Sequence, residues 1–239
     1  MKAWARNLSL IAIFAAGTLI WLHRAQSAEP PVRIPPPAQD EPASGAHSET
    51  AVFAGGCFWG VQGVFEHVRG VRQAVAGYSG GAANTAQYET VERGDTGHAE
   101  SVRVTFDPAQ VSYGHLLQIY FSVVQNPTEL DYQGPDQGTQ YRSALFPLDA
   151  SQRSVAQAYI VQLGNAKVFP APIVTAIETF KGFYPAEGYH QNFLERHPDN
   201  PYIVYNDMPK ITALRKLFPS LYRGNAVLAS GRGLNERTD

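Results

Sequence analysis

The fold of this chain is decided by residues 50–68, which read TAVFAGGCFWGVQGVFEHV. Residues 50–54 predict a short apolar strand, and the glycine pair Gly55-Gly56 ends it. From Phe58 onward apolar side chains recur at helical spacing, which predicts a helix. Cys57, the one cysteine of the chain, is therefore expected at or next to the N-terminus of that helix.

The following segments predict four more strands and two more helices. Strands are expected over residues 71–78, 143–146 and 173–180, and residues 101–106 alternate polar and apolar side chains as a half-buried strand does. Ser112 can cap a helix over residues 113–124, and a second helix is expected to be capped near Ser151. The order contains β-α-β-β-α-β, which predicts an α+β fold, a two-layer sandwich related to the split βαβ (ferredoxin-like) arrangement.

The two ends of the chain differ in composition from its centre. Lys2 and Arg6 precede an uncharged stretch at residues 8–22, the plan of a signal peptide or signal anchor over residues 1–27. Six prolines predict a Pro-rich, extended linker over residues 28–49. The catalytic domain is expected over residues 50–222 and a flexible tail over residues 223–239. The protein is thus expected to be exported to the periplasm or otherwise outside the cytoplasm, either released or anchored in the membrane through residues 8–22.

Composition excludes several classes of protein. With 44% hydrophobic and 17% charged residues among 239, the chain is globular and has one or at most two domains. A formal net charge of −2 argues against a polybasic nucleic-acid binder, so no nucleic-acid partner is expected. A single cysteine rules out an intramolecular disulfide and a zinc site built on several thiolates.

The position of Cys57 favours a reactive thiol. Backbone N–H groups at a helix start stabilise negative charge by about 0.3–1 kcal/mol, which predicts a raised thiolate fraction at neutral pH. Phe58 and Trp59 add an apolar wall. The alternative is a buried, inert cysteine, which is common for free cysteines in general. The coincidence of a strand, two glycines, a thiol and a helix start at one point favours the reactive thiol.

A second cluster of polar side chains runs from Tyr88 to Glu100 at the start of a strand. Glu100 can equally be a solvated turn residue there, and His98 a capping donor. A third cluster, residues 133–143, gathers amide, carboxyl, phenol and guanidinium groups in a loop. Its alternative is a turn held by Asx hydrogen bonds and by a pair between Arg142 and a carboxylate.

A fourth cluster contains His190 and His197, which are seven residues apart. No second cysteine or nearby acidic pair accompanies them, so packing and hydrogen bonding are expected rather than metal binding.

Four motifs in this order resemble the A-type peptide-methionine (S)-S-oxide reductases: G-C-F-W-G, G-D-T-G-H-A-E, G-T-Q-Y-R-S and A-E-x-Y-H-Q. The resemblance covers roughly residues 50–220. It implies that the chain reduces methionine-S-sulfoxide, free or in peptides and proteins, to methionine and so repairs oxidised proteins. It also implies the family's own α+β sandwich.

The resemblance further implies a role for each site residue. Sulfoxide sulfur is attacked readily only when its oxygen is protonated or strongly hydrogen-bonded, so a nucleophile needs a paired acid. Cys57 is the expected nucleophile and Glu100 the expected acid, and each is expected to raise the pKa of the other. The remaining expected site residues are Tyr88 and Tyr141, which donate to the sulfoxide oxygen, Asp136 in support, and Phe58 and Trp59, which bind the substrate around its methyl group.

Two departures from the family pattern refine this expectation. Gln62 stands where many members have a glutamate, and the C-terminal resolving cysteines of many members are missing. The chain therefore resembles the single-cysteine subtype. Its sulfenic acid on Cys57 would be reduced by an external thiol, either a small thiol or a thioredoxin-like protein. No bound metal or organic cofactor is implied.

Two other functions use the same residues. A cysteine acyltransferase or amidase would pair Cys57 with His98 or His190 as the base. A binding module would recognise oxidised methionine without turnover.

The first prediction concerns export. Alkaline phosphatase fused after Pro42 is expected to be active, because residues 1–27 carry it out of the cytoplasm. If alkaline phosphatase were inactive and a reporter that works only in the cytoplasm were active when fused at the same position, export would be refuted.

Overall fold

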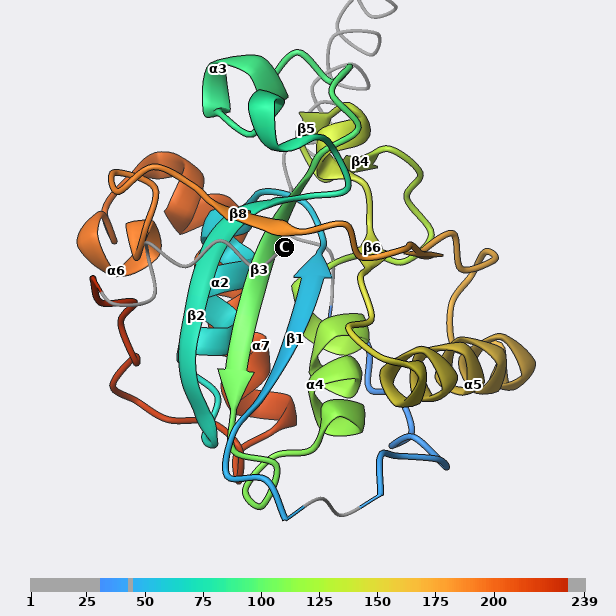
Figure 1. Cartoon of the computed structure of the whole chain (residues 1–239). Helices are drawn as coiled ribbons and strands as arrows, with labels where there is room; N and C mark the ends of the chain where they lie inside the picture. Colours follow the sequence, from blue (N-terminus) through green and yellow to red (C-terminus); the bar gives the residue numbers. More distant parts are fainter. Residues whose placement is uncertain (1–30, 43–44, 232–239) are drawn as a thin grey trace, which may run out of the picture.

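A six-stranded mixed sheet forms the centre of the computed structural model, which describes residues 31–42 and 45–231 (Figure 1). Its strand order is β7-β6-β1-β3-β2-β8. The strands are β1 (Glu49–Ala54), β2 (Val71–Ser79), β3 (Ala99–Phe106), β6 (Ala144–Leu145), β7 (Ala176–Ile177) and β8 (Phe183–Pro185), while β4 (Tyr132–Gln133) and β5 (Asp136–Gln137) pair separately.

The connection of β1 to β2 is a split βαβ unit. Both strands run antiparallel to β3, which lies between them, so β1 and β2 are parallel to each other. The helix that joins them is α2 (Phe58–Glu66). The α+β class and the split βαβ arrangement predicted from the sequence are confirmed.

Helices cover one face of the sheet. In Figure 1, α2, α4 (Tyr113–Ile119) and α7 (Met208–Leu217) lie along this face, and α5 (Ala150–Ala166) lies at the β6 side. The main core fills the space between them, with Phe53 and Val104 from the sheet and Leu117 and Leu214 from the helices. The remaining helical segments are η1 (Ala83–Thr85), α3 (Tyr88–Val91), η2 (Tyr120–Val124), η3 (Thr139–Tyr141), α6 (Phe193–Arg196) and η4 (Ile203–Asp207).

The helix caps agree with the sequence at one site and differ at another. Ser112 caps α4 as expected, because its hydroxyl accepts from the His115 N–H at 3.2 Å. Helix α5 begins two residues earlier than expected, since Asp149 rather than Ser151 accepts from the Gln152 N–H at 2.8 Å. The stronger acceptor at the earlier position sets the helix start.

Strand β3 is buried on both faces, not half-buried as its alternation predicts. Val102 and Val104 face the main core as expected. Arg103, on the opposite face, is 7% exposed and lies with its guanidinium 4.9 Å from the centre of the Phe183 ring. A second, smaller core that includes Phe183 and Phe146 covers this face.

The strand expected over residues 173–180 is reduced to β7, Ala176–Ile177. On one side of it the Val174 N–H donates to the Pro127 carbonyl at 2.7 Å. On the other side the Glu178 carboxylate pairs with Arg142. The Val174 N–H is thereby used outside the ladder, whereas the Glu178 N–H still donates to the Leu145 carbonyl of β6 at 2.9 Å.

The described part of the Pro-rich segment is extended but lies against the domain rather than apart from it. Tyr159 of α5 donates its hydroxyl to the Pro35 carbonyl at 2.6 Å, and Asp40 accepts from the Gly114 N–H of α4 at 2.9 Å. Ile34 is buried in the main core. Prolines give the segment its extended shape, and these contacts fix where it lies. The expected signal segment at residues 1–27 lies outside the described residues. Among residues 31–42 and 45–231, none of the helices has the length and apolar character to cross a membrane.

The described part of the C-terminal tail, residues 223–231, also packs on the domain. The Val227 N–H donates to the Glu66 carbonyl at 2.9 Å, and Ala229 exchanges two hydrogen bonds with the Asn192 side chain. These contacts place residues 223–231 against the end of α2 and Asn192, and the flexibility expected of the tail over residues 223–239 stays a prediction.

The second prediction concerns the loop before α2. Gly56 has φ of +87°, and a Cβ there would lie 2.7 Å from Cβ of Gln133. Gly56→Ala should lower the free energy of unfolding by about 1–3 kcal/mol, through strain and crowding. Gly164→Ala is the matched control: in exposed α5 its Cβ meets nothing within 4 Å. It should raise stability by about 0.5–1 kcal/mol. Equal urea midpoints for parent and Gly56→Ala would contradict this account.

Candidate active site

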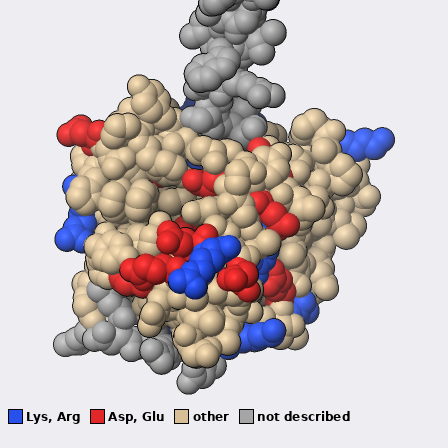
Figure 2. Space-filling view, turned by 90° about the horizontal axis from the view of Figure 1, so that it is seen from above, with Lys and Arg blue, Asp and Glu red and all other residues tan. Residues whose placement is uncertain are grey.

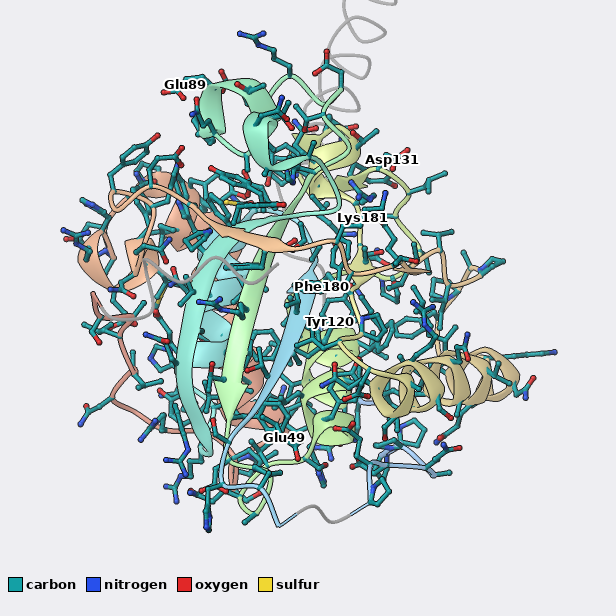
Figure 3. All side chains as sticks on the ribbon, in the orientation of Figure 1. Glu49, Glu89, Tyr120, Asp131, Phe180 and Lys181 are labelled. Carbon is teal, nitrogen blue, oxygen red and sulfur yellow. The ribbon has the colours of Figure 1, made fainter. Side chains whose placement is uncertain are left out.

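Cys57 is the N-cap residue of α2 and follows β1 through Gly55 and Gly56. The end of β1 is held by Tyr120, which donates its hydroxyl to the Ala54 carbonyl at 2.7 Å (Figure 3). A Cβ on Gly55 would lie 3.2 Å from the Tyr120 ring, so the glycine permits this close approach. The thiol is thus presented by a turn that only small residues allow.

Glu100 reaches the same point from β3. Ala54 at the end of β1 pairs with Ser101 near the start of β3, which places Glu100 beside the first turn of α2. Its carboxylate oxygen Oε2 accepts from the Phe58 N–H at 2.9 Å, and the residue is 3% exposed. The sequence left open whether Glu100 was a solvated turn residue; the structure buries it next to Cys57.

Glu100 is a neutral acid at neutral pH. Burial raises its pKa from the ordinary 4.5 to about 8, against the opposing effect of the Phe58 N–H, and Asp136 raises it further. A protonated carboxyl at this position can give a proton to a bound oxygen.

The Cys57 thiol is also protonated at rest. Burial raises its pKa well above the ordinary value, and the carboxyl groups of Glu100, Asp207 and Asp136 act in the same direction. The Trp59 N–H at the helix start lowers it, but by less. Glu100 raises the pKa of Cys57 as expected, but Cys57 is not among the groups that shift the pKa of Glu100. The raised thiolate fraction expected from the helix start is wrong, because desolvation outweighs the effect of the helix.

Two phenols belong to the same electrostatic cluster. Burial raises the pKa of Tyr88 and of Tyr141, and Glu100 is the next cause for both. Cys57 raises both as well, so all four groups lie within electrostatic reach of one another. Tyr88 is anchored by its backbone N–H, which donates to Glu187 at 3.0 Å. Both phenols keep their protons and can donate hydrogen bonds.

Aromatic rings form one wall of the site. Trp59 stacks on Phe193, with ring centres 3.7 Å apart and planes at 9°, and meets the Tyr202 ring edge-on at 5.7 Å. Phe58 packs against the His190 ring at 5.0 Å. Phe58 and Trp59 thus lie in one cluster of rings with residues of the C-terminal segment, and their contact with substrate stays a prediction.

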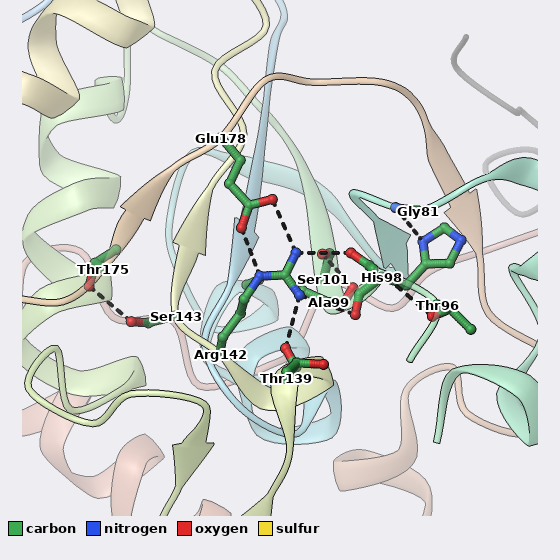
Figure 4. Close-up of polar contacts among 12 residues, drawn as sticks. Gly81, Thr96, His98, Ala99, Ser101, Thr139, Arg142, Ser143, Thr175 and Glu178 are labelled. Atoms are coloured by element: carbon green, nitrogen blue, oxygen red, sulfur yellow. Dashed lines mark hydrogen bonds and ion pairs between the residues drawn. The ribbon is translucent and has the colours of Figure 1, made fainter. Parts of the chain in front are cut away.

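Asp136 occupies β5 and accepts a short hydrogen bond from the Tyr202 hydroxyl. Burial raises the pKa of Asp136, while that hydrogen bond lowers it. The loop that carries Asp136 and Tyr141 is fixed by Arg142, whose guanidinium pairs with Glu178 at 2.7 Å and donates to the Thr139 carbonyl (Figure 4). The Arg142–carboxylate pair offered as the alternative for this loop is therefore present and supports the site residues.

The sequence did not point to Tyr202 or Asp207. Asp207 is fully buried, and a Cβ on Gly60 would lie 2.0 Å from its Oδ1 atom, so the glycine gives it access to the first turns of α2. Lys210 donates to the same oxygen at 3.2 Å. Neither residue lies in a motif that the sequence singled out, and η4, which begins after Tyr202 and ends at Asp207, was not predicted. Only Gly60, inside the G-C-F-W-G motif, indicated that another segment packs closely against this part of α2.

The two candidate histidine bases have other partners. His98 accepts from the Gly81 N–H at 3.2 Å and donates to the Ala82 carbonyl at 3.0 Å. His190 accepts at Nδ1 from the Trp59 indole N–H at 3.1 Å. Burial lowers the pKa of both. In the described part of the chain neither hydrogen-bonds to Cys57, which leaves the acyl-transfer alternative without its base.

Gln62 and the histidine pair have structural roles. Gln62 donates to the Ala74 carbonyl at 2.9 Å and accepts from the Asn192 N–H at 2.9 Å, a combination that a carboxylate cannot provide. His197 packs on Phe193, away from the Trp59 partner His190. Residues 31–42 and 45–231 contain no group of three or more His, Cys, Asp or Glu side chains placed to hold a metal.

The surface at this end of the molecule carries charges of both signs. Figure 2 views it from the end where α3, β4 and β5 lie in Figure 1, and acidic and basic side chains lie next to one another on it. Such a mixture is not a field of one sign that would steer a charged polymer.

Comparison with known proteins places this geometry in a family. A sequence model of "Peptide methionine sulfoxide reductase" matches residues 49–221. The chain belongs to the peptide methionine sulfoxide reductase family. It is 64% identical over 181 residues to the "Peptide methionine sulfoxide reductase MsrA 2" of Mesorhizobium japonicum, which covers 76% of this chain and 93% of that protein. It is 52% identical over 171 residues to the MsrA 2 of Synechocystis sp., covering 72% and 80%.

Solved structures of methionine sulfoxide reductases agree with this family assignment. The reduced form of Mxr1 from Saccharomyces cerevisiae is 29% identical with a TM-score of 0.57, covering 67% of this chain and 91% of that one. Methionine sulfoxide reductase A of Corynebacterium diphtheriae is 27% identical with a TM-score of 0.53, covering 73% and 90%. This reductase is an oxidoreductase that converts methionine sulfoxide to methionine.

The third prediction tests the acid of this reductase. Glu100→Gln keeps an oxygen to accept from the Phe58 N–H but cannot give up a proton. The rate of the chemical step should fall about 10²-fold or more, measured in a single turnover. Glu89→Gln, on exposed α3, removes a carboxylate without touching the site and should keep the parent rate. If Glu100→Gln reacted at the same single-turnover rate as the parent, another group would have to donate the proton.

The pH dependence of stability gives this variant a second readout. The folded protein keeps the Glu100 proton up to about pH 8, whereas the unfolded chain releases it near pH 4.5. The free energy of unfolding of the parent therefore falls between these pH values by up to about 1.4 kcal/mol per pH unit. Glu100→Gln lacks this loss and should gain stability relative to the parent from pH 5 to pH 8. A constant difference would mean that Glu100 is ionised in the folded protein.

Proposed function

We propose that this reductase attacks the S epimer of methionine sulfoxide with the Cys57 sulfur and passes through a sulfenic acid on Cys57. The observation that carries the proposal is the placement of this pair: the partly buried Cys57 thiol at the α2 N-cap, and the buried Glu100 carboxyl bound to the next backbone N–H. Tyr88 and Tyr141 add two protonated phenols. Together they supply a nucleophile and the donors for an oxygen.

The protonation states of Cys57 and Glu100 fit this reaction. Glu100 gives its proton to the sulfoxide oxygen as the Cys57 sulfur attacks the sulfoxide sulfur, and the thiol proton replaces it. The attack forms a bond between the Cys57 sulfur and the substrate sulfur. As the oxygen passes to Cys57, the S–O bond of the substrate and this S–S bond both break and an S–O bond on Cys57 forms, so that thiol and sulfoxide become sulfenic acid and thioether. Both groups start neutral, which avoids two buried negative charges side by side.

Selectivity for one epimer follows from the two unlike sides of the site. The Phe58 and Trp59 rings suit the substrate methyl group, and Glu100 with the phenols suits the oxygen. The R epimer would place its oxygen against the rings, where it finds no hydrogen-bond donor.

Recycling of the sulfenic acid requires an external thiol. The chain has one cysteine, so no intramolecular disulfide can form. A thiol from outside displaces water from the Cys57 sulfenic acid to give a mixed disulfide, and a second thiol releases Cys57. Repair of oxidised proteins outside the cytoplasm fits the basic and apolar N-terminal stretch, Lys2 to Leu22, where export or anchoring would begin.

The fourth prediction tests this scheme. One equivalent of methionine-S-sulfoxide without reductant should add about 16 Da to the parent, block further turnover, and make it react with dimedone. The R epimer should leave the mass unchanged. Cys57→Ser should show neither change, because a hydroxyl oxygen is a poor nucleophile toward sulfoxide sulfur.

Other outcomes would exclude the scheme. A trapped thioester would establish acyl transfer. Stoichiometric binding of the sulfoxide without methionine release would make the protein a binding module. Repeated turnover without thiol would rule out the sulfenic acid as an obligatory intermediate.

A further inference from the structure

A cavity of about 450 Å³ adjoins the active site. Cys57, Asp136 and Tyr202 form part of its wall, so the cavity is continuous with the site already described. Cavities of about 300–1,000 Å³ hold drug-sized ligands, whereas the side chain of methionine sulfoxide is short and unbranched. The cavity therefore has room for more of a substrate than the side chain that reacts.

The wall of this cavity is largely apolar. Val32, Phe169 and Pro209 contribute to it from three segments that are far apart in the sequence. Val32 and Phe169 pack against the main core but are only partly buried, so each keeps exposed apolar surface. Covering such surface with an apolar ligand group removes it from water and favours binding.

The polar side chains of the wall are largely bonded to neighbouring groups. Tyr202 donates its hydroxyl to Asp136, and the Lys210 ammonium group pairs with a buried carboxylate at 3.2 Å. Gln133 accepts from the Asn126 N–H at 2.8 Å and donates to the Asn126 carbonyl at 2.9 Å. The surface that remains for a ligand is thus mainly that of the apolar side chains.

One side of the cavity comes from the Pro-rich segment, which lies outside the residues 49–221 that the family model matches. The Val32 N–H donates to the Ser122 carbonyl at 3.2 Å, and the Ile34 carbonyl accepts from the Gln118 side chain at 3.0 Å. Ile34 itself is buried in the main core. Val32 is therefore held in place before a ligand binds, which lowers the entropy cost of binding.

We propose that this cavity binds an apolar side chain next to methionine sulfoxide in a peptide substrate, and that Val32 and Phe169 determine this preference. The inference rests on the proposed attack by Cys57. Consecutive Cα atoms of a peptide are about 3.8 Å apart, so the neighbour of the reacting residue stays close to the active site. Because the cavity is continuous with that site, the covalent link delivers the neighbouring side chain to it without a separate encounter.

The test compares three blocked tetrapeptides that contain methionine-S-sulfoxide, with leucine before it, leucine after it, or glycine at both positions. At least one leucine peptide should have a kcat/KM about tenfold above that of the glycine peptide. The difference should lie in KM, because burial of leucine adds binding that is the same before and during the reaction. N-acetyl-methionine-S-sulfoxide methylamide has no neighbouring side chain and serves as the reference for the reaction itself.

Variants locate the effect. Val32→Ser and Phe169→Ser each remove apolar surface from the wall, and each should lower the ratio of leucine to glycine peptide by about threefold or more. Neither should change the rate on the reference compound. Val161→Ser is the matched control, because this valine is 60% exposed on α5 and does not line the cavity. The ratio within one variant cancels any change in the reactivity of Cys57 or in the amount of folded enzyme.

Several outcomes would overturn the proposal. The parent could reduce all three peptides with equal kcat/KM, or the leucine preference could persist in both cavity variants. A rise in kcat/KM for all peptides alike in Val32→Ser would mean that a segment of this chain occupies the cavity. A change in sedimentation with unchanged ratios would make this surface an interface between two copies. Failure to reduce the reference compound would instead refute the proposed function itself.

Discussion

The hydrogen bond from the Phe58 backbone N–H to Glu100 is the contact on which the site depends. It joins residues 42 positions apart in the chain, the first turn of α2 and the first part of β3. The split βαβ topology makes it possible, because β3 lies between β1 and β2 and starts where β1 ends. A thiol at the end of β1 and an acid at the start of β3 are thereby placed together by strand pairing.

Desolvation decides the charge state of this pair. Three carboxyl groups, those of Glu100, Asp136 and Asp207, raise the pKa of Cys57, and burial raises the pKa of each of them. The helix start contributes only about 0.3–1 kcal/mol in the other direction. The resting site therefore holds its protons, which suits a reaction in which oxygen must be protonated as sulfur attacks.

Residues that do not react hold this arrangement in place. Glu187 receives the Tyr78 hydroxyl at 2.9 Å and the Tyr88 N–H at 3.0 Å, which ties α3 to the sheet. Arg142 ties the loop of Asp136 and Tyr141 to Glu178. Each of these contacts includes a carboxylate and is at least partly buried, so it fixes geometry more firmly than a surface contact would.

The sequence by itself determined the β-α-β-β-α-β order, the position of Cys57 at a helix start and the motifs that contain Glu100 and Tyr141, because periodicity and glycine pairs are local properties. It could not decide that β3 is buried on both faces, that Cys57 is a neutral thiol, or that Tyr202 and Asp207 reach the site. These depend on which segments pack together: the C-terminal segment closes over the rings, and the Pro-rich segment lies on α4 and α5. Burial and long-range pairing set those outcomes, and only the tertiary structure contains them.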